Sequence, residues 1–372
     1  MNVRRIRWDG FRIPLLRPFE TAHGALTCRE GLLVQVITDL GLVGLGEISP
    51  LPAFSGATVA AALAVLRRWA PALIGVAVDG LDRRLTTLDT GEPGASTVRC
   101  GLDVAACDVL ARARGSSVAE LLGGVARPLV PVNATVASVT PLVAAEAAGA
   151  AVAAGYRCVK LKVGTAPSWQ KEVERVAVVR EAIGPATRLR LDANGAWDVD
   201  SAIRTLQALE RFDLELVEQP VPADDLVGLG RVRHATRIPI AADESVSGPA
   251  RAREILETGA ADVLIVKPMV VGGLRSARAI VELARLAGRR AIVTTTIDAG
   301  IGTMAALHLA ATVLDGALAH GIATGALLAG DLIDKPLAVE RGAMRLFRRP
   351  GLGVEIDPEQ LRRFGSGVRG EA

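Results

Sequence analysis

Five short apolar segments between Lys160 and Lys267 each end in ionisable side chains. The segments read VKLKVG, LRLDANG, LELVEQP, IPIAADES and DVLIVKP, and their terminal groups are Lys160 with Lys162, Asp192, Glu218, Asp243 and Lys267. From Lys162 onward these groups follow one another at steps of 30, 26, 25 and 24 residues, the length of a strand, a turn, a helix and a loop. Charged residues at the ends of successive parallel strands meet at one rim of a barrel. The spacing therefore predicts that these side chains converge on one site.

The three carboxylates of this set predict a metal site. Asp192, Glu218 and Asp243 would lie on successive strands, and three carboxylates so close together repel one another unless a cation neutralises them. A set of oxygen donors without His or Cys suits Mg²⁺, with Mn²⁺ as the alternative. Each carboxylate alone is more typical of a helix cap or a salt bridge, so the prediction depends on all three together.

The lysines predict proton transfer beside that metal. Lys160 and Lys162 are two residues apart on one strand, so their side chains share a face, which is the interior in a barrel. An edge strand with two solvated lysines is the alternative for this segment alone. A nearby cation and a second lysine disfavour the ammonium form, so that a lysine can act as a base. With Lys267 on the opposite side, the expected chemistry is removal of a proton next to a carboxylate to give an enediolate, whose charge the metal offsets.

The segments before the repeat predict an α+β unit. Three antiparallel strands are expected at Val3–Leu15, Gly31–Thr38 and Gly41–Glu47, with a long loop over Arg17–Glu30 between the first two, and helices follow up to residue 125.

From residue 129 onward strand and helix patterns alternate as seven βα units, and an eighth strand is expected over Leu318–Gly325. We therefore expect an α/β fold, in which a modified (β/α)7β TIM barrel over residues 126–334 follows a capping domain over 1–125, with the tail 335–372 packed back on the cap. An open doubly wound sheet would need a Gly-rich phosphate loop, which the sequence lacks.

The composition of the chain argues against a nucleic-acid or membrane partner. The chain has 372 residues, half of them hydrophobic, and a net charge of only +3. Its short basic clusters carry no interleaved aromatics, so a nucleic-acid partner is not expected. No run of about 18 uninterrupted apolar residues predicts a membrane span, and no signal peptide is evident. Four cysteines without ligand spacing indicate free thiols. We expect a cytoplasmic enzyme for a small-molecule carboxylate, with a homo-oligomer left open.

The motif order KxK, DAN, EQP, DES and KP followed by GG resembles the enolase superfamily, in its muconate-lactonising-enzyme-like subgroup. The resemblance covers nearly the whole chain and implies a Lys base working with Mg²⁺. The roles that it implies are Mg²⁺ ligation by Asp192, Glu218 and Asp243, general base for Lys162, a lysine on the opposite face for Lys267, and support of the substrate carboxylate and of Lys162 for Lys160. No His stands near the sixth or seventh strand end, which argues against the mandelate-racemase-like members.

Within the subgroup, AHGIATGALLAGDL, PLLRPFETAHG, GLGEISPLPAFSG and PGLGVEID resemble o-succinylbenzoate synthases. The implied reaction is Mg-dependent dehydration of 2-succinyl-6-hydroxy-2,4-cyclohexadiene-1-carboxylate to 2-succinylbenzoate, a step of menaquinone biosynthesis. N-succinylamino acid racemisation is the closest alternative, followed by dipeptide epimerisation and muconate cycloisomerisation. Dipeptide epimerases carry Asp-x-Asp on the eighth strand, where this chain has Gly321 and Ala323. A non-catalytic barrel is disfavoured because all six charged groups are present.

Several further residues are candidates for substrate contact. A small Gly321 leaves room for a ring over the metal, where Lys267 would make a cation–π contact. Arg29 would face the succinyl carboxylate from the cap. Asn194 shares a face with Asp192 and would support the metal site, with an Asx turn as the alternative.

Thr296 and Asp298, at the seventh strand end, complete the candidates, and Asp298 replaces a Glu that is frequent in the family. In two loops, His23 would touch substrate or be solvated, and Phe54 is expected to be exposed.

Overall fold

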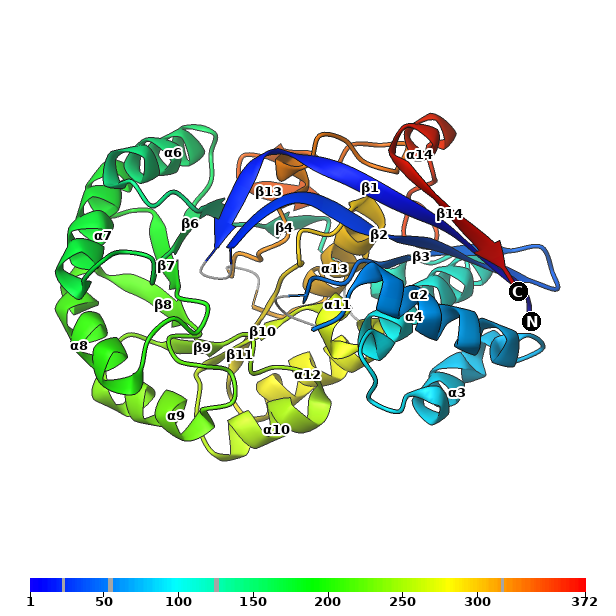
Figure 1. Ribbon diagram of the computed structural model, residues 1–372, viewed down its shortest axis with the longest axis horizontal. Helices are drawn as coiled ribbons and strands as arrows, with labels where there is room; N and C mark the ends of the chain where they lie inside the picture. The colour runs from blue at the N-terminus through cyan, green and yellow to red at the C-terminus, as the bar shows by residue number, and fades with distance from the viewer. Residues whose placement is uncertain (22–23, 53–55, 124–126, 316–317) are drawn as a thin grey trace.

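The computed structural model describes residues 1–21, 24–52, 56–123, 127–315 and 318–372. A curled parallel sheet surrounded by helices lies beside an antiparallel sheet that packs on its own helices (Figure 1). The fold is thus mixed α/β, as the alternation of patterns predicts. His23 and Phe54 lie outside the described residues.

The antiparallel sheet has the strand order β14-β1-β2-β3. Its strands are β1 (Val3–Thr21), β2 (Gly24–Thr38), β3 (Val43–Ile48) and β14 (Gly365–Glu371). The helices that follow β3 are α2 (Val59–Trp69), α3 (Leu81–Leu88), α4 (Ala95–Ala113) and α5 (Val118–Leu121). Helix α4 crosses β3 in close contact, because a Cβ built on Gly46 would lie 1.9 Å from the carbonyl oxygen of Gly101.

The prediction of a loop over Arg17–Glu30 is wrong. The first two strands instead extend through this segment as one long hairpin, which pairs Phe19 with Leu26 and arches over the open end of the barrel (Figure 1). The ladder is irregular between Pro14 and Phe19, where proline lacks a donor. That proline and the charged residues around it break the alternating pattern by which a strand is recognised.

The parallel sheet has the order β11-β10-β9-β8-β7-β6-β5. Its strands are β5 (Ala134–Val136), β6 (Cys158–Lys162), β7 (Arg188–Asp192), β8 (Leu214–Glu218), β9 (Ile240–Ala242), β10 (Val263–Val266) and β11 (Arg290–Val293). The helices around it are α6 (Pro141–Ala153), α7 (Trp169–Ile183), α8 (Val199–Leu209), α9 (Leu226–Ala235), α10 (Pro249–Glu257), α11 (Pro268–Val271), α12 (Leu274–Leu286) and α13 (Gly300–Ala310).

Two isolated parallel bridges close the barrel, one between Val132 and His320 and one between Thr294 and Gly321. The eighth strand expected over Leu318–Gly325 is thus reduced to these bridging residues. The tail contributes β12 (Val339–Glu340), which pairs with β13 (Ala343–Arg345), and β13 pairs in turn with β4 (Leu129–Pro131). The tail also contributes α14 (Pro358–Phe364), which precedes β14.

The lower layer of the barrel is apolar and determines which residues reach the rim. The side chains of this layer are Leu216, Ala241, Val263, Ile265, Ile292 and Leu318. Alternate residues of a strand share a face, so the next inward positions are Glu218, Asp243, Lys267 and Thr294. The helices of the described ranges include none long and apolar enough to cross a membrane.

Candidate active site

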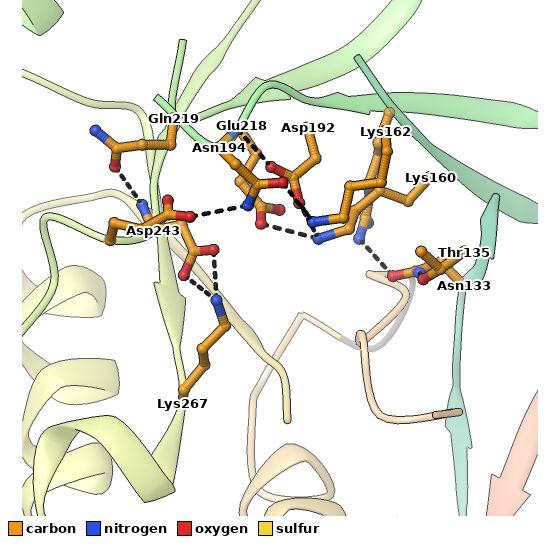
Figure 2. A network of polar contacts seen from close by, with 12 residues as sticks. Asn133, Thr135, Lys160, Lys162, Asp192, Asn194, Glu218, Gln219, Asp243 and Lys267 are labelled. Atoms are coloured by element: carbon orange, nitrogen blue, oxygen red, sulfur yellow. Dashed lines mark hydrogen bonds and ion pairs between the residues drawn. The ribbon is translucent and has the colours of Figure 1, made fainter. Parts of the chain in front are cut away.

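The predicted carboxylates come together at the rim. One oxygen of each of Asp192, Glu218 and Asp243 lies within 4.8 Å of the others, and all three residues are buried (Figure 2). Asp192 and Glu218 end β7 and β8 and pair in register, and Asp243 directly follows β9. The alternation of strand side chains therefore aims the carboxylates into the barrel mouth.

The lysines flank these carboxylates on two sides. Lys160 Nζ donates to Glu218 Oε1 at 2.8 Å and lies 2.8 Å from Asp192 Oδ2. Lys162 Nζ donates to Asp192 Oδ2 at 2.6 Å. Lys267 approaches from the opposite side and donates to both oxygens of Asp243 (Figure 2). These three lysines and the three carboxylates are called the rim cluster below.

The electrostatics of the rim cluster fit a bound divalent cation. Burial, together with the charge of Asp192, raises the pKa of Glu218 to about 8. Burial also raises the pKa of Asp243. Burial alone would raise the pKa of Asp192 as well, but Lys160 and Lys162 outweigh it and lower that pKa. A cation among these oxygens would stabilise the ionised forms of Glu218 and Asp243, which burial disfavours. A donor set of carboxylate oxygens suits Mg²⁺.

Asn194, two residues after Asp192, supports the rim cluster through its side-chain amide. Its Oδ1 accepts from Lys162 Nζ at 2.8 Å, and its Nδ2 donates to Glu244 Oε1 at 2.8 Å. The backbone N–H of Asn194 donates to Asp192 Oδ1 at 3.1 Å, and Asn194 has a φ of 46°. The Asn194 side chain thus has the supporting position, and the Asx-type turn at this point is made by the Asp192 carboxylate to the Asn194 N–H.

Two supporting residues were missed in the sequence, although both lie inside the motifs. Gln219 Oε1 accepts from the N–H of Asp243 at 2.9 Å and thus holds the turn that presents this carboxylate. Glu244 accepts a hydrogen bond from Asn194 beside the three carboxylates. The EQP and DES motifs contain these residues, so the available signal was their position next to a predicted ligand.

A cavity opens above the rim cluster and beneath the β1–β2 hairpin. One end is charged, the cover is apolar, and the wall formed by β5, β11 and the eighth segment carries hydroxyl groups. The charged end is lined by Lys160, Lys162, Asp192, Asn194 and Lys267; the cover by Phe19, Ala25, Leu26, Leu51 and Ile297; and the wall by Thr135, Thr294, Thr295, Thr296, Gly321 and Thr324.

Of the candidates for substrate contact, Asn194, Thr296 and Gly321 line this cavity, whereas Arg29 and Asp298 do not. The Arg29 guanidinium is buried and donates to the backbone carbonyls of Ser49, Pro50 and Ile297 at 2.7, 3.1 and 3.1 Å. The structure therefore does not support a substrate contact for Arg29, because its donors face the backbone.

Asp298 lies behind the wall and accepts from the N–H and the hydroxyl of Thr296 at 3.1 and 2.6 Å. Glu47 of β3 lies close by and accepts from the N–H groups of Ala299 and Gly302, at 2.8 Å each, at the start of α13. Arg29, Glu47 and Asp298 form what we call the junction cluster. Glu47 was not singled out in the sequence, because it meets Asp298 only once the antiparallel sheet packs on the barrel.

Ala323, the second position of the Asp-x-Asp comparison, does not line the cavity. It lies instead in a groove between the barrel and the tail, with Tyr156 and Asp331. Only Gly321 of that pair faces the rim cluster.

Comparisons with known proteins agree with this geometry. Residues 11–123 match the model of the mandelate racemase / muconate lactonizing enzyme N-terminal domain, and residues 142–360 match that of the enolase C-terminal domain-like family. The chain is 39% identical to o-succinylbenzoate synthase of Thermobifida fusca (strain YX) over 62% of this chain and 73% of that protein.

Two solved structures extend the comparison over the full length. A dipeptide epimerase from Enterococcus faecalis V583, complexed with Mg and the dipeptide L-Leu-L-Tyr, has a TM-score of 0.90 and 29% identity, over 95% of this chain and all of that one. An N-succinyl Arg/Lys racemase from Bacillus cereus has a TM-score of 0.94 and 26% identity, over the whole of both chains.

Proposed function

Since the chain belongs to the enolase superfamily, in its muconate-lactonising-enzyme-like subgroup, we propose that it is an Mg-dependent o-succinylbenzoate synthase. It would dehydrate 2-succinyl-6-hydroxy-2,4-cyclohexadiene-1-carboxylate to 2-succinylbenzoate in menaquinone biosynthesis. A cytoplasmic location, where its four free cysteines stay reduced, is part of this proposal.

The observation that carries the proposal is the charge of the cavity lining. Among the described residues that line the cavity, the only carboxylate is Asp192, which also faces the metal site. An ammonium group in this partly buried space would lack a counter-charge. The substrate is therefore expected to be anionic and without an amine, and the resemblance to the Thermobifida fusca enzyme supports the same choice.

In the proposed reaction the metal ligands and Lys160 bind, and the other lysines act on the substrate. Asp192, Glu218 and Asp243 would hold Mg²⁺, which when bound supplies positive charge near the substrate carboxylate. Burial alone would lower the pKa of Lys160, but Asp192 and Glu218 outweigh it and raise that pKa. Lys160 therefore stays charged and binds the substrate carboxylate.

Lys162, held by Asp192 and Asn194, is the base in this scheme. It removes the α-proton, and the electron pair of that C–H bond is delocalised onto the substrate carboxylate as an enediolate. The ring then expels its hydroxyl group, and Lys162 returns the proton so that water leaves and the ring becomes aromatic. Lys267 faces the ring from the other side, where its ammonium offsets negative charge.

N-succinylamino acid racemisation is a second candidate. It needs the same removal of an α-proton, and its substrates are carboxylates whose α-nitrogen is acylated and therefore uncharged. The similarity to the Bacillus cereus racemase over the whole of both chains favours this activity.

One assay separates these reactions. The purified protein with Mg²⁺ is offered the cyclohexadiene acid, a panel of N-succinylamino acids and a panel of dipeptides. We expect rapid formation of the aromatic product, slower racemisation of N-succinylamino acids and no epimerisation of dipeptides. Racemisation faster than dehydration would move the assignment to the racemase, and epimerisation of dipeptides would contradict the charge argument.

Gly321→Asp, with Ala323→Asp as its control, tests whether an anionic substrate lies against the cavity wall. A Cβ at this position would lie 2.7 Å from Thr294 Cγ2, and the carboxylate would repel an anionic substrate, so dehydration should be suppressed. Ala323→Asp is the control, because Ala323 lies outside the cavity. Equal loss in both variants would show that the effect does not come from the cavity.

A further inference from the structure

One threonine of the cavity wall has a buried hydroxyl without a partner among the described residues. Thr294 is 5% exposed and lines the cavity, but its Oγ1 is itself buried and makes no hydrogen bond with any of them. Its two neighbours in the sequence differ in this respect. Thr295 shares a hydrogen bond of 2.8 Å with the hydroxyl of Thr324, and the hydroxyl of Thr296 donates to Asp298.

The position of Thr294 in the barrel corresponds to that of the rim cluster. Ile292, two residues earlier, belongs to the apolar layer inside the barrel, so Thr294 is the next inward residue of this strand. Its N–H donates to the carbonyl of Val266 at 3.0 Å, which places it beside Lys267 on the adjacent strand. The seventh strand thus presents a hydroxyl group at the level where the sixth presents an ammonium group.

The methyl group of Thr294 lies next to Gly321. A Cβ built on Gly321 would lie only 2.7 Å from Thr294 Cγ2, so the methyl branch packs against the space that the glycine leaves open. The hydroxyl is therefore on the other branch of Cβ. A larger residue at 321 would displace Thr294, and the two positions are coupled in size.

A buried hydroxyl without a partner destabilises the free protein, whereas an apolar group of the same shape does not. Valine has nearly the volume of threonine and would fill the site without that loss. The hydroxyl is therefore best explained by a ligand that completes its hydrogen bonding.

We infer that Thr294 is a substrate-binding residue whose hydroxyl, turned toward the cavity when substrate binds, donates a hydrogen bond to a carbonyl group that one atom separates from the α-carbon of the substrate. The inference rests on the proposed function. In the cyclohexadiene substrate that carbonyl is the ketone of the succinyl group, which is attached to the ring carbon next to the α-carbon.

The same carbonyl occurs in the competing substrates. N-succinylamino acids carry an amide carbonyl at this separation from the α-carbon, and so does the C-terminal residue of a dipeptide. Thr294 would therefore select for the carbonyl itself, while the missing counter-charge rejects the amine. Because the carbonyl does not react, its hydrogen bond should be equally strong in the ground state and the transition state. Such uniform binding lowers KM and leaves kcat unchanged.

The test compares Thr294→Val and Thr294→Ser with Thr312→Val. Thr312 is also buried, but its hydroxyl donates to the carbonyl of Leu309 at 2.7 Å at the end of α13, away from the cavity. For Thr294→Val we expect KM to rise about tenfold, kcat to stay within about twofold, and Tm to stay equal or rise. Thr294→Ser should keep KM near that of the wild type. Thr312→Val should keep both kinetic constants and lower Tm.

The outcomes separate this inference from the proposed function. An unchanged KM in Thr294→Val, or a Tm that falls together with the rise in KM, would overturn the inference, since the hydroxyl would then have no ligand or would already have a structural partner. If the wild type converts neither succinyl substrate, the proposed function fails. The same comparison is then made with dipeptides, which carry the same carbonyl, and it decides the role of Thr294 by the same two outcomes.

Discussion

Two clusters of buried charge in this protein, the rim cluster and the junction cluster, are built differently. In the rim cluster, the lysine and carboxylate side chains meet mainly one another, at the ends of strands that belong to a single sheet (Figure 2). In the junction cluster, the charged groups meet mainly backbone groups: Arg29 binds the carbonyl of Ile297 and two carbonyls just after β3, and Glu47 binds N–H groups at the start of α13. The first arrangement leaves charge directed into a cavity, whereas the second uses charge to hold two units together.

The junction cluster nevertheless affects the cavity indirectly, through a residue that lines it. Arg29 holds the carbonyl of Ile297, a residue that lines the cavity with a φ of 62°. A branched residue adopts such a backbone conformation only when its surroundings enforce it. The contrast therefore predicts that changes in the rim cluster reduce chemistry, while changes in the junction cluster reduce stability.

The largest effect is expected from Lys162→Ala. Exchange of the α-hydrogen of an N-succinylamino acid with deuterated solvent, followed by NMR, should fall by about 1,000-fold or more, since the variant lacks the general base. Affinity for Mg²⁺ should persist, because Lys162 offers no oxygen ligand. Lys171→Ala, which removes an exposed lysine paired with Glu174, is the control. Exchange at the wild-type rate in Lys162→Ala would exclude this residue as the base.

The metal ligands come next. Asp192→Asn and Glu218→Gln should each weaken Mg²⁺ binding by about a hundredfold or more, because each removes a charged oxygen donor for a hard cation. Isothermal titration calorimetry measures the affinity, and Asp200→Asn, which changes an exposed carboxylate on α8, should leave it unaltered. An unchanged titration in both ligand variants would break the assignment of the metal site.

The difference between the two clusters also explains what the sequence predicted well. The six members of the rim cluster lie at or just after the ends of five successive strands, with Lys160 and Lys162 on the same one. Local patterns at a regular spacing therefore located all six, and the apolar run before each one indicated the direction of its side chain. The junction cluster joins positions separated by about 250 residues, and no local pattern brings Glu47 to α13.

The same reasoning accounts for the errors of interpretation. Arg29 was expected to face the succinyl carboxylate from the cap, yet its guanidinium donates to the carbonyl groups of Ser49, Pro50 and Ile297. Unlike its two neighbouring threonines, Thr294 has a hydroxyl without a partner among the described residues, which residue type does not reveal. The eighth strand was predicted too long because two bridging residues suffice to close the barrel.

A smaller effect, on stability instead of chemistry, is expected from Glu47→Gln. Burial, together with the charge of Asp298, raises the pKa of Glu47 to about 7. The folded protein then binds a proton more tightly than the unfolded chain, so the free energy of unfolding should fall as pH rises from about 4.5 to about 7. Removal of this titrating group should flatten that slope in urea-unfolding measurements, with kcat retained within a few-fold.

The control for this variant is Glu30→Gln, which changes an exposed carboxylate of the same sheet, paired with Arg12. It should reproduce the slope of the wild type. A Glu47→Gln protein with wild-type stability at every pH and a large loss of kcat would abolish the distinction between the two clusters.

The smallest effect concerns a third contact between units, one that uses a neutral group. His308 of α13 is fully buried; its Nδ1 accepts from the N–H of Ala119 at 3.2 Å, and its Nε2 donates to the carbonyl of Leu352 at 3.1 Å. Burial lowers the pKa of His308 to about 4. The unfolded chain therefore takes up this proton first, and the free energy of unfolding should fall as pH decreases from about 6.5 toward 4.

His308→Gln should make this part of the acid sensitivity disappear, because an amide supplies one donor and one acceptor but does not titrate in this range. Urea unfolding at pH 7 and pH 5 measures the difference, which should be smaller in the variant than in the wild type. His234→Gln, at an exposed position of α9, should keep the wild-type difference. An equal loss of stability on acidification in wild type and His308→Gln would mean that the unfolding seen at low pH begins elsewhere, and the charged junction cluster would then be the first place to examine.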